Sequence, residues 1–312
     1  MYLKSVSSLL LTITAGFLAP IFIGWLAFGT FTDYLPLLEQ PTMTRTPVYF
    51  MSHGGPNIME QTEHPAFATL QSIGKEITNQ VKPKAVVVFS AHWQASRHTI
   101  EFNMAKTIDL IYDMYGFPQH YYEMQYPNEG SPELAVRVLD LLKSAGIEAK
   151  GVHRGLDHGV WAPFTVAFNP ESNALGVPLV QVSLFASDDP DVHFRLGQAI
   201  FGLRDEGVQI IVSGMAVHNL RDMQVASKSP GALPYVTSFD EALREAVEAP
   251  VDERQGAMRS LLERPDARKA HPSFDHLLPL YVGAGAAGTD RGRRLWTLAE
   301  GSFSWAQFGW GC

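Results

Sequence analysis

The sequence predicts an α/β fold, in which a single domain with a central, mostly parallel sheet flanked by helices is preceded by an N-terminal hydrophobic helix. From residue 47 onward, short apolar runs of strand length alternate with longer segments in which apolar residues recur at helical spacing. Such alternation is typical of strands that run parallel in one sheet covered on both faces. Ahead of them, residues 5–32 carry no charged side chain, which predicts the separate hydrophobic helix.

Composition limits the classes of partner and of site. A chain of 312 residues is long enough for a large core. Its formal net charge of -8 and the lack of any Lys/Arg block argue against a nucleic-acid partner. The one cysteine, Cys312, excludes disulfides within the chain and thiolate metal clusters. A bound metal would therefore need imidazole or carboxylate ligands.

The N-terminal apolar run matches the roughly 20 residues needed to cross a bilayer. Pro20 within this run is tolerated better in a membrane helix than in a soluble one. We therefore divide the chain into a hydrophobic segment (1–33), a linker (34–46) and the main domain (47–312), and expect membrane association through residues 5–32. A cleaved signal and a tail docked on the main domain are the competing interpretations, and a cytoplasmic location is the alternative.

The main domain is expected to alternate between strands and helices. Apolar or alternating runs predict strands over 47–52, 84–91, 99–104, 148–154, 178–185 and 208–215. Amphipathic spacing predicts helices over 65–81, 131–145, 192–207 and 238–249. The second helix has the clearest start, because Ser131 is a natural N-cap, Pro132 suits the first turn and Glu133 complements the positive helix end. The Gly-rich segment 282–292 lacks the strand–GxGxxG–helix context and is interpreted as a tight loop.

Three histidines follow predicted strands in the same way. His53 follows "PVYFMS", His92 follows "VVVFSA" and His218 follows "QIIVSGMAV". Because the carboxyl ends of parallel strands meet at one edge of a sheet, these three side chains are expected to lie close together. By itself, the motif around His53 or His92 is equally compatible with a structural histidine in a turn, whereas the position of His218 favours a functional residue. The repetition favours a functional site.

Two further motifs contain histidines. "GLDHGVWAPF" places His158 beside Asp157, which either orients an imidazole or caps the helix that follows. We expect His158 to act on substrate rather than to bind a metal directly. "HPSFDHLLPL" carries His271 and His276, which are five residues apart and do not share a helix face well. We choose His276 for the site, because it leads into the apolar segment.

Taken together, the motifs "SHGGP", "SAHW", "GFPQHYYEMQYPNEGSPELA", "LDHGVWAPF", "SGMAVHNLRD" and "HLLPLYVGAGA" occur in the order and approximate spacing of the class III extradiol ring-cleavage dioxygenases. The chain resembles the 4,5-DOPA extradiol dioxygenase branch of this LigB-like superfamily from about Pro47 to its end. The resemblance implies that His53, His92 and His276 bind a metal. It implies that His218 is the catalytic acid/base, and we assign His158 as a second catalytic histidine.

By this resemblance, the main domain would insert both atoms of O2 into a catechol-type aromatic and open its ring. One divalent metal ion is implied, Fe(II) for dioxygenase activity, with Zn(II) as an alternative bound ion because imidazole ligands favour it. Tyr115 and Phe117, in "YDMYGFPQHYY", and Asp157 are the expected substrate contacts. The alternative functions are a zinc hydrolase that uses a metal-bound hydroxide and a non-catalytic, membrane-tethered protein that binds aromatics.

Overall fold

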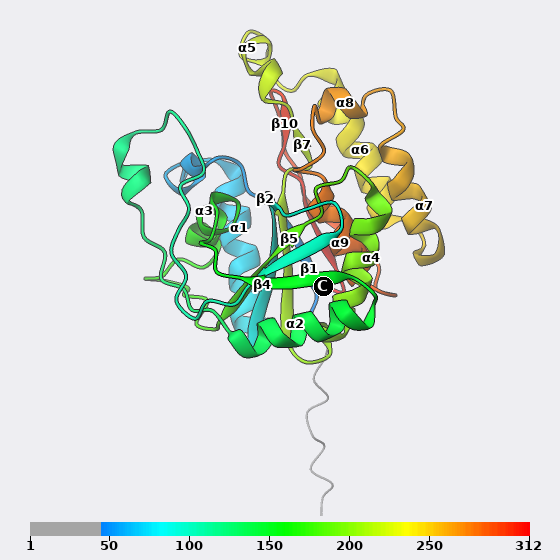
Figure 1. The fold of residues 1–312 in the computed structure, drawn as a ribbon. Helices are drawn as coiled ribbons and strands as arrows, with labels where there is room; N and C mark the ends of the chain where they lie inside the picture. The colour runs from blue at the N-terminus through cyan, green and yellow to red at the C-terminus, as the bar shows by residue number, and fades with distance from the viewer. Residues whose placement is uncertain (1–44) are drawn as a thin grey trace, which may run out of the picture. The chain divides into compact units, whose positions relative to one another are not determined.

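The computed structural model describes residues 45–312, in which eight strands form one central sheet in the order β4-β3-β5-β2-β6-β1-β11-β8 (Figure 1). The bounds of these strands are β1 (Val48–Ser52), β2 (Ala85–Gln94), β3 (Thr99–Asn103), β4 (Glu148–Val152), β5 (Leu179–Leu184), β6 (Val208–Gly214), β8 (Gly292–Trp296) and β11 (Gln307–Trp310). A smaller sheet has the order β7-β10-β9 and consists of β7 (Val217–His218), β9 (Ala299–Glu300) and β10 (Phe303–Ser304).

The helices of the described chain are α1 (Pro65–Glu76), α2 (Pro132–Ser144), α3 (His158–Ala167), α4 (Pro190–Ile200), α5 (Met223–Ala226), α6 (Pro234–Glu248), α7 (Val251–Leu261), α8 (Ala267–Ala270) and α9 (Leu278–Ala286). Shorter helical turns are η1 (Pro56–Met59), η2 (Ile77–Val81), η3 (Gln119–Glu123), η4 (Phe201–Arg204) and η5 (Leu220–Asp222).

The middle of the central sheet is parallel. β5, β2, β6 and β1 pair in parallel along the sheet, whereas β11 pairs antiparallel with β1 and with β8. β3 runs parallel to β4 and antiparallel to β5. Every residue of β1, β5 and β6 is buried, as expected for strands covered on both faces. The prediction of a single α/β domain with a mostly parallel sheet is confirmed.

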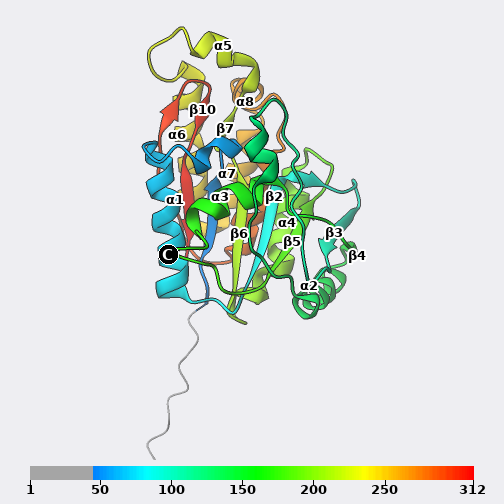
Figure 2. The same cartoon turned by 90° about the vertical axis from the view of Figure 1, so that its left-hand side faces the viewer.

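Helices cover both faces of this sheet (Figures 1 and 2). Alternate residues of β1 point to opposite faces, so Val48 and Phe50 join the core under α4 and α9, while Tyr49 and Met51 join the core under α1 and α3. This alternation explains why the strand is apolar throughout, since neither of its faces meets water. The strand ends that carry histidines therefore rest on a rigid, fully covered scaffold.

The start of α2 matches the prediction in detail, since the Ser131 hydroxyl accepts a hydrogen bond from the Leu134 amide and Pro132 begins the helix. The prediction of a tight loop over 282–292 is wrong in its first part, because α9 continues to Ala286. The glycines permit close packing here: a methyl group on Gly285 would overlap the Phe194 carbonyl of α4. A Gly-rich pattern therefore marks a close helix contact as well as a loop.

The predicted membrane anchor over residues 5–32 and most of the linker lie outside the described residues. Within residues 45–312, none of the helices has the length and the apolar character needed to span a bilayer.

Candidate metal centre

The carboxyl end of the central sheet delivers the first two histidines of the site. His53 directly follows β1. His92 lies within β2, because this strand continues to Gln94, three residues beyond its predicted end at Ala91. β1 and β2 both pair in parallel with β6, so the two side chains emerge at the same edge. The Nε2 atoms of His53 and His92 are 3.3 Å apart.

His276 comes from the turn before α9 and docks against the end of β6. The Met215 amide donates to the His276 carbonyl at 2.9 Å, and the His53 amide donates to the Gly214 carbonyl at 2.9 Å. Gly214 allows this approach, because a methyl group at its Cα would overlap the His276 carbonyl oxygen. The end of β6 thereby holds the backbones of both histidines.

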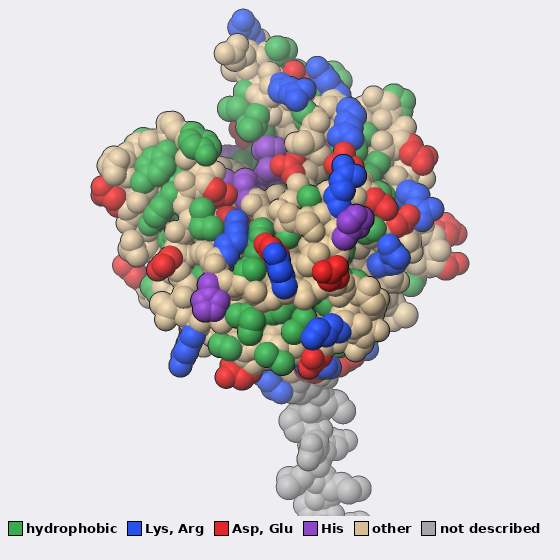
Figure 3. All heavy atoms as spheres, in the orientation of Figure 1, with side chains coloured by type: hydrophobic (Ala, Val, Ile, Leu, Met, Phe, Trp, Pro, Cys, Tyr) green, Lys and Arg blue, Asp and Glu red, His purple; other side chains and the backbone are tan. Residues whose placement is uncertain are grey.

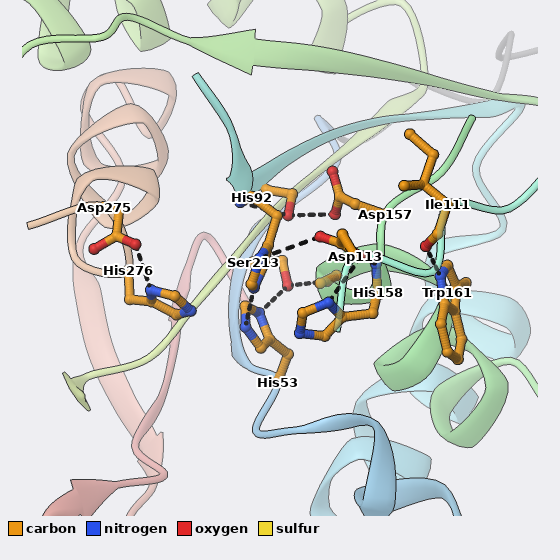
Figure 4. A network of polar contacts seen from close by, with 12 residues as sticks. His53, His92, Ile111, Asp113, Asp157, His158, Trp161, Ser213, Asp275 and His276 are labelled. Carbon is orange, nitrogen blue, oxygen red and sulfur yellow. Dashed lines mark hydrogen bonds and ion pairs between the residues drawn. The ribbon is translucent and has the colours of Figure 1, made fainter. Parts of the chain in front are cut away.

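Three imidazoles converge in this arrangement (Figure 4). His53, His92 and His276 each offer one ring nitrogen, and these nitrogens all lie within 4.8 Å of one another. The ring centroids of His276 are 5.3 Å from His53 and 4.9 Å from His92. Three nitrogens at such spacing can reach one ion at the usual metal–nitrogen distance of about 2 Å after small adjustments.

Neighbouring oxygens set which ring nitrogen carries the proton. The Ser213 hydroxyl donates its only hydrogen to the Gly159 carbonyl, so it accepts from His53 Nδ1, which lies 2.9 Å away. His276 Nδ1 faces Asp275 Oδ2 at 3.0 Å, and His92 Nδ1 faces Asp113 Oδ2 at 3.3 Å. With the proton on Nδ1 in each ring, all three Nε2 lone pairs are free to bind a metal.

The electrostatics also favour neutral ligands. Burial first, and the neighbouring histidines second, hold the pKa of His53 well below its usual value. Burial likewise lowers the pKa of His92, together with the charges of His158 and His276. Neutral imidazoles keep their lone pairs at neutral pH. A set of three imidazoles suits a single divalent ion of the iron or zinc type, and the residues present therefore fit the expected metal.

His158 lies beside this triad at the first turn of α3. Its ring centroid is 4.0 Å from that of His92 and 6.1 Å from that of His53. Both its backbone amide and its Nδ1 face Asp113 Oδ1 at 2.9 Å. Burial by itself raises the pKa of the Asp113 carboxyl, but its hydrogen bonds with His158 and the charge of His92 outweigh this effect and bring the pKa to about 2.

His218, in β7, approaches the triad from the smaller sheet. Its ring stacks on His276 with a centroid distance of 3.7 Å and an interplanar angle of 15°. Burial, followed by the charges of His276 and His271, lowers the pKa of His218 to about 2. His218 is therefore a neutral imidazole next to the triad, and its ring lies parallel to that of one of the three.

Asp157 occupies the N-cap position of α3, but its side chain does not cap the helix. The carboxylate is fully buried and accepts hydrogen bonds from Ser90 Oγ and Gln181 Nε2, both at 2.6 Å, and from Arg154 Nη1 at 3.0 Å. Ser90 Oγ also accepts from the His92 amide at 3.2 Å. Through Ser90, the Asp157 carboxylate thus helps to hold β2 in place next to His92.

The two aromatic residues expected near the substrate differ in position. Phe117 packs against Tyr121 with a centroid distance of 5.4 Å, and a methyl group on Gly55 would lie 3.8 Å from its ring. Phe117 therefore adjoins the loop after His53. Tyr115 is 93% exposed and points into solvent. Figure 3 shows histidine side chains (purple) at the bottom of a hollow between the lobe that carries η3 and the projection that carries α5.

His271 lies outside the triad. It is fully buried, its Nε2 bonds to the Ala216 carbonyl at 2.9 Å, and its ring packs on Phe239. Trp93 is buried beneath the guanidinium of Arg154, with a distance of 4.5 Å from Cζ to the ring centroid. Both side chains are therefore part of the packing around the site.

Sequence reasoning missed three residues that contact the triad directly, namely Ser213, Asp113 and Asp275. Asp275 precedes His276 in the chain, so an adjacent carboxylate was the available signal. Asp113 lies inside the aromatic segment 112–122, in which only the rings predict a function. Ser213 lies in a predicted strand, and no local feature distinguishes it from other buried serines.

A family model described as the catalytic LigB subunit of aromatic ring-opening dioxygenase matches residues 42–306. This range includes the three converging histidines together with His158 and His218.

Individual relatives cover most of the chain. A 4,5-DOPA dioxygenase extradiol of Beta vulgaris is 37% identical over 242 residues, which are 77% of this chain and 86% of that protein. A 4,5-DOPA dioxygenase extradiol of Escherichia coli K12 is 34% identical over 256 residues, or 80% and 89% of the two chains. The crystal structure of an uncharacterised protein of Escherichia coli K12 has a TM-score of 0.67 at 27% identity, covering 86% of this chain and 100% of that chain.

Proposed function

The chain belongs to the LigB family of catalytic subunits of aromatic ring-opening dioxygenases and is a non-haem extradiol dioxygenase. We propose that it cleaves a catechol-type aromatic at an Fe(II) ion held by His53, His92 and His276. The observation that carries the proposal is the convergence of three imidazole rings. In each ring Nδ1 faces a neighbouring oxygen, which leaves Nε2 for the metal. These three residues would hold one divalent ion.

Fe(II), when bound, would supply neighbouring coordination positions for the catechol and O2 and a path for electrons between them. The protein supplies the remaining functions. The three neutral histidines leave the ion's positive charge uncompensated, which favours a catecholate as the bound form of the substrate.

We assign two histidines to the transfer of the catechol's protons. In its neutral form, His218 can accept one from a catechol hydroxyl. The resulting catecholate anion stabilises the protonated ring, so substrate binding raises the proton affinity of His218 above its value in the free site. His158, whose ring adjoins that of His92, uses Nδ1 for Asp113. Its Nε2 can accept a hydrogen bond or a proton from the second catechol hydroxyl.

The three residues expected to contact the substrate are assigned different roles. We assign Phe117 to the wall of the substrate hollow, because it adjoins the loop after His53. Tyr115 belongs to the outer rim, where it is largely exposed. We reassign Asp157 from substrate contact to the support of His92, because its two oxygens already accept bonds from three buried or half-buried side chains.

The test is anaerobic loading with Fe(II) followed by O2 uptake on a panel of substituted catechols, including DOPA. Uptake with a yellow semialdehyde-type product is the expected result, and Zn(II)-loaded protein serves as the control because zinc is not redox-active. His53→Ala and His92→Ala should abolish metal binding and ring cleavage together. His98→Ala, an exposed histidine outside the site, should affect neither. Fe(II)-loaded protein that consumes no O2 with any catechol would refute the proposal.

A further inference from the structure

Asp113 lies between two histidines that the proposed function places in different roles. It belongs to the irregular segment between β3 and η3, and its carboxylate is directed toward both His92 and His158 (Figure 4). Its side chain is 22% exposed, so the carboxylate is shielded from bulk water on most sides.

Each carboxylate oxygen faces a different ring. Oδ1 lies 2.9 Å from His158 Nδ1 and also accepts from the His158 amide at 2.9 Å. Oδ2 lies 3.3 Å from His92 Nδ1. An ionised carboxylate only accepts hydrogen bonds, so the bond with His158 requires a proton on His158 Nδ1, and the contact with His92 favours a proton on His92 Nδ1.

The consequence for both rings is the same tautomer. A proton on Nδ1 leaves the Nε2 lone pair of His92 free, and this atom is 3.3 Å from His53 Nε2 inside the triad. It also leaves the Nε2 lone pair of His158 free as an acceptor, next to the His92 ring. The Asp113 carboxylate thus favours the same tautomer in His92, the proposed ligand, and in His158, which lies next to it.

We propose that Asp113 is a positioning residue that fixes His92 as a metal ligand and His158 as an acceptor for a substrate hydroxyl at the same time. The part concerning the metal rests on geometry alone, whereas the part concerning the hydroxyl rests on the proposed function. Asp113 itself touches neither metal nor substrate in this scheme and acts through the two rings.

The segment that carries Asp113 is anchored by bonds that do not use its side chain. The Ile111 amide donates to the Leu156 carbonyl at 2.7 Å, and the Leu156 amide donates to the Asp109 carbonyl at 2.8 Å. The Trp161 indole donates to the Ile111 carbonyl at 3.0 Å. Replacement of the Asp113 side chain by one of equal size should therefore leave the path of the backbone intact.

Asp113→Asn tests the proposal, because the amide has one acceptor oxygen and one donor nitrogen. The donor nitrogen would face a ring Nδ1 and drive that ring to the other tautomer, which puts a proton on Nε2. In the full-length protein, we expect the Zn(II) affinity, measured by competition with a chromogenic chelator, to fall by roughly 10–100-fold. Asp109→Asn, which removes the same charge from an exposed position in the same segment, should retain the affinity.

Unchanged Zn(II) affinity in Asp113→Asn, or equal losses in both variants, would overturn the proposal. The part concerning His158 is tested by a double-mutant cycle with His158→Gln, measured as kcat at saturating Fe(II) and catechol. If Asp113 acts through His158, its substitution should add little to the loss already caused by His158→Gln. Fully additive losses would refute that part. Zn(II) affinity is measured without substrate, so a failure of the proposed ring cleavage leaves the metal result interpretable.

Discussion

Replacement of Gly159 by alanine would place a methyl group directly against two of the imidazoles that we propose as metal ligands. Gly159 follows His158 in the first turn of α3. The added carbon would lie 2.7 Å from His92 Cδ2 and 3.2 Å from His53 Cε1, and it would also overlap Ser90 Oγ. Both ring carbons are bonded to the Nε2 atom that faces the metal site, so any displacement moves the ligand atoms themselves.

The size of the effect follows from these distances. Carbon atoms in contact normally stay at least ~3.5 Å apart, so the His92 ring would have to move by roughly 0.8 Å. Functional sites tolerate displacements of only about 0.5 Å, so we expect a loss of metal affinity of at least ~10-fold. Overpacking costs about 1–3 kcal/mol, against which the better helix propensity of alanine returns up to ~1 kcal/mol. The folded state should therefore survive with a modest loss of stability.

The assay is the Zn(II) competition titration, combined with urea unfolding of the chelator-treated protein. Gly256→Ala is the matched control, because Gly256 lies exposed within α7 and a methyl group there would meet no atom within 4 Å. The control should bind metal normally and gain about 0.5–1 kcal/mol in the free energy of unfolding. Wild-type metal affinity in Gly159→Ala would refute the assignment of His53 and His92 as ligands in this geometry.

Three further outcomes are expected. His218→Gln should retain the metal but lose ~10²–10⁴-fold in turnover, and near-normal turnover would remove it from proton transfer. Burial lowers the pKa of His271 to about 4, so the unfolded chain binds this proton first and stability rises with pH between about 4 and the unfolded value of ~6.5, by up to ~1.4 kcal/mol per unit. In urea unfolding of the metal-free protein, His271→Gln should reduce the slope of stability against pH, and an unchanged slope would contradict the reasoning. Ser131→Ala should cost about 1 kcal/mol of unfolding free energy through loss of the α2 cap, and an effect near zero would show that the cap is replaced.

The alternation of strands and helices was readable from sequence, because the buried strands are rich in apolar residues and several helices begin at a recognisable cap or proline. The strand-end positions of His53 and His92 were readable for the same reason. The prediction for α9 was wrong in part, because sequence does not distinguish glycines that allow close packing against α4 from glycines in a loop. Local patterns report backbone preference, and they do not report which neighbour requires the missing side chain.

Sequence alone was sufficient for the fold class, which depends on periodicity and on order along the chain. The histidines that the structure brings together were named by the resemblance to a known family. The oxygens that prepare those histidines depended on tertiary structure. Ser213 is 160 residues from His53, and Asp113 is 45 residues from His158. Hydrogen bonds between such distant residues form only when particular strands and loops are brought to the same edge of the sheet. Their geometry depends on a few tenths of an ångström in side-chain position, which the order of apolar and polar residues does not encode.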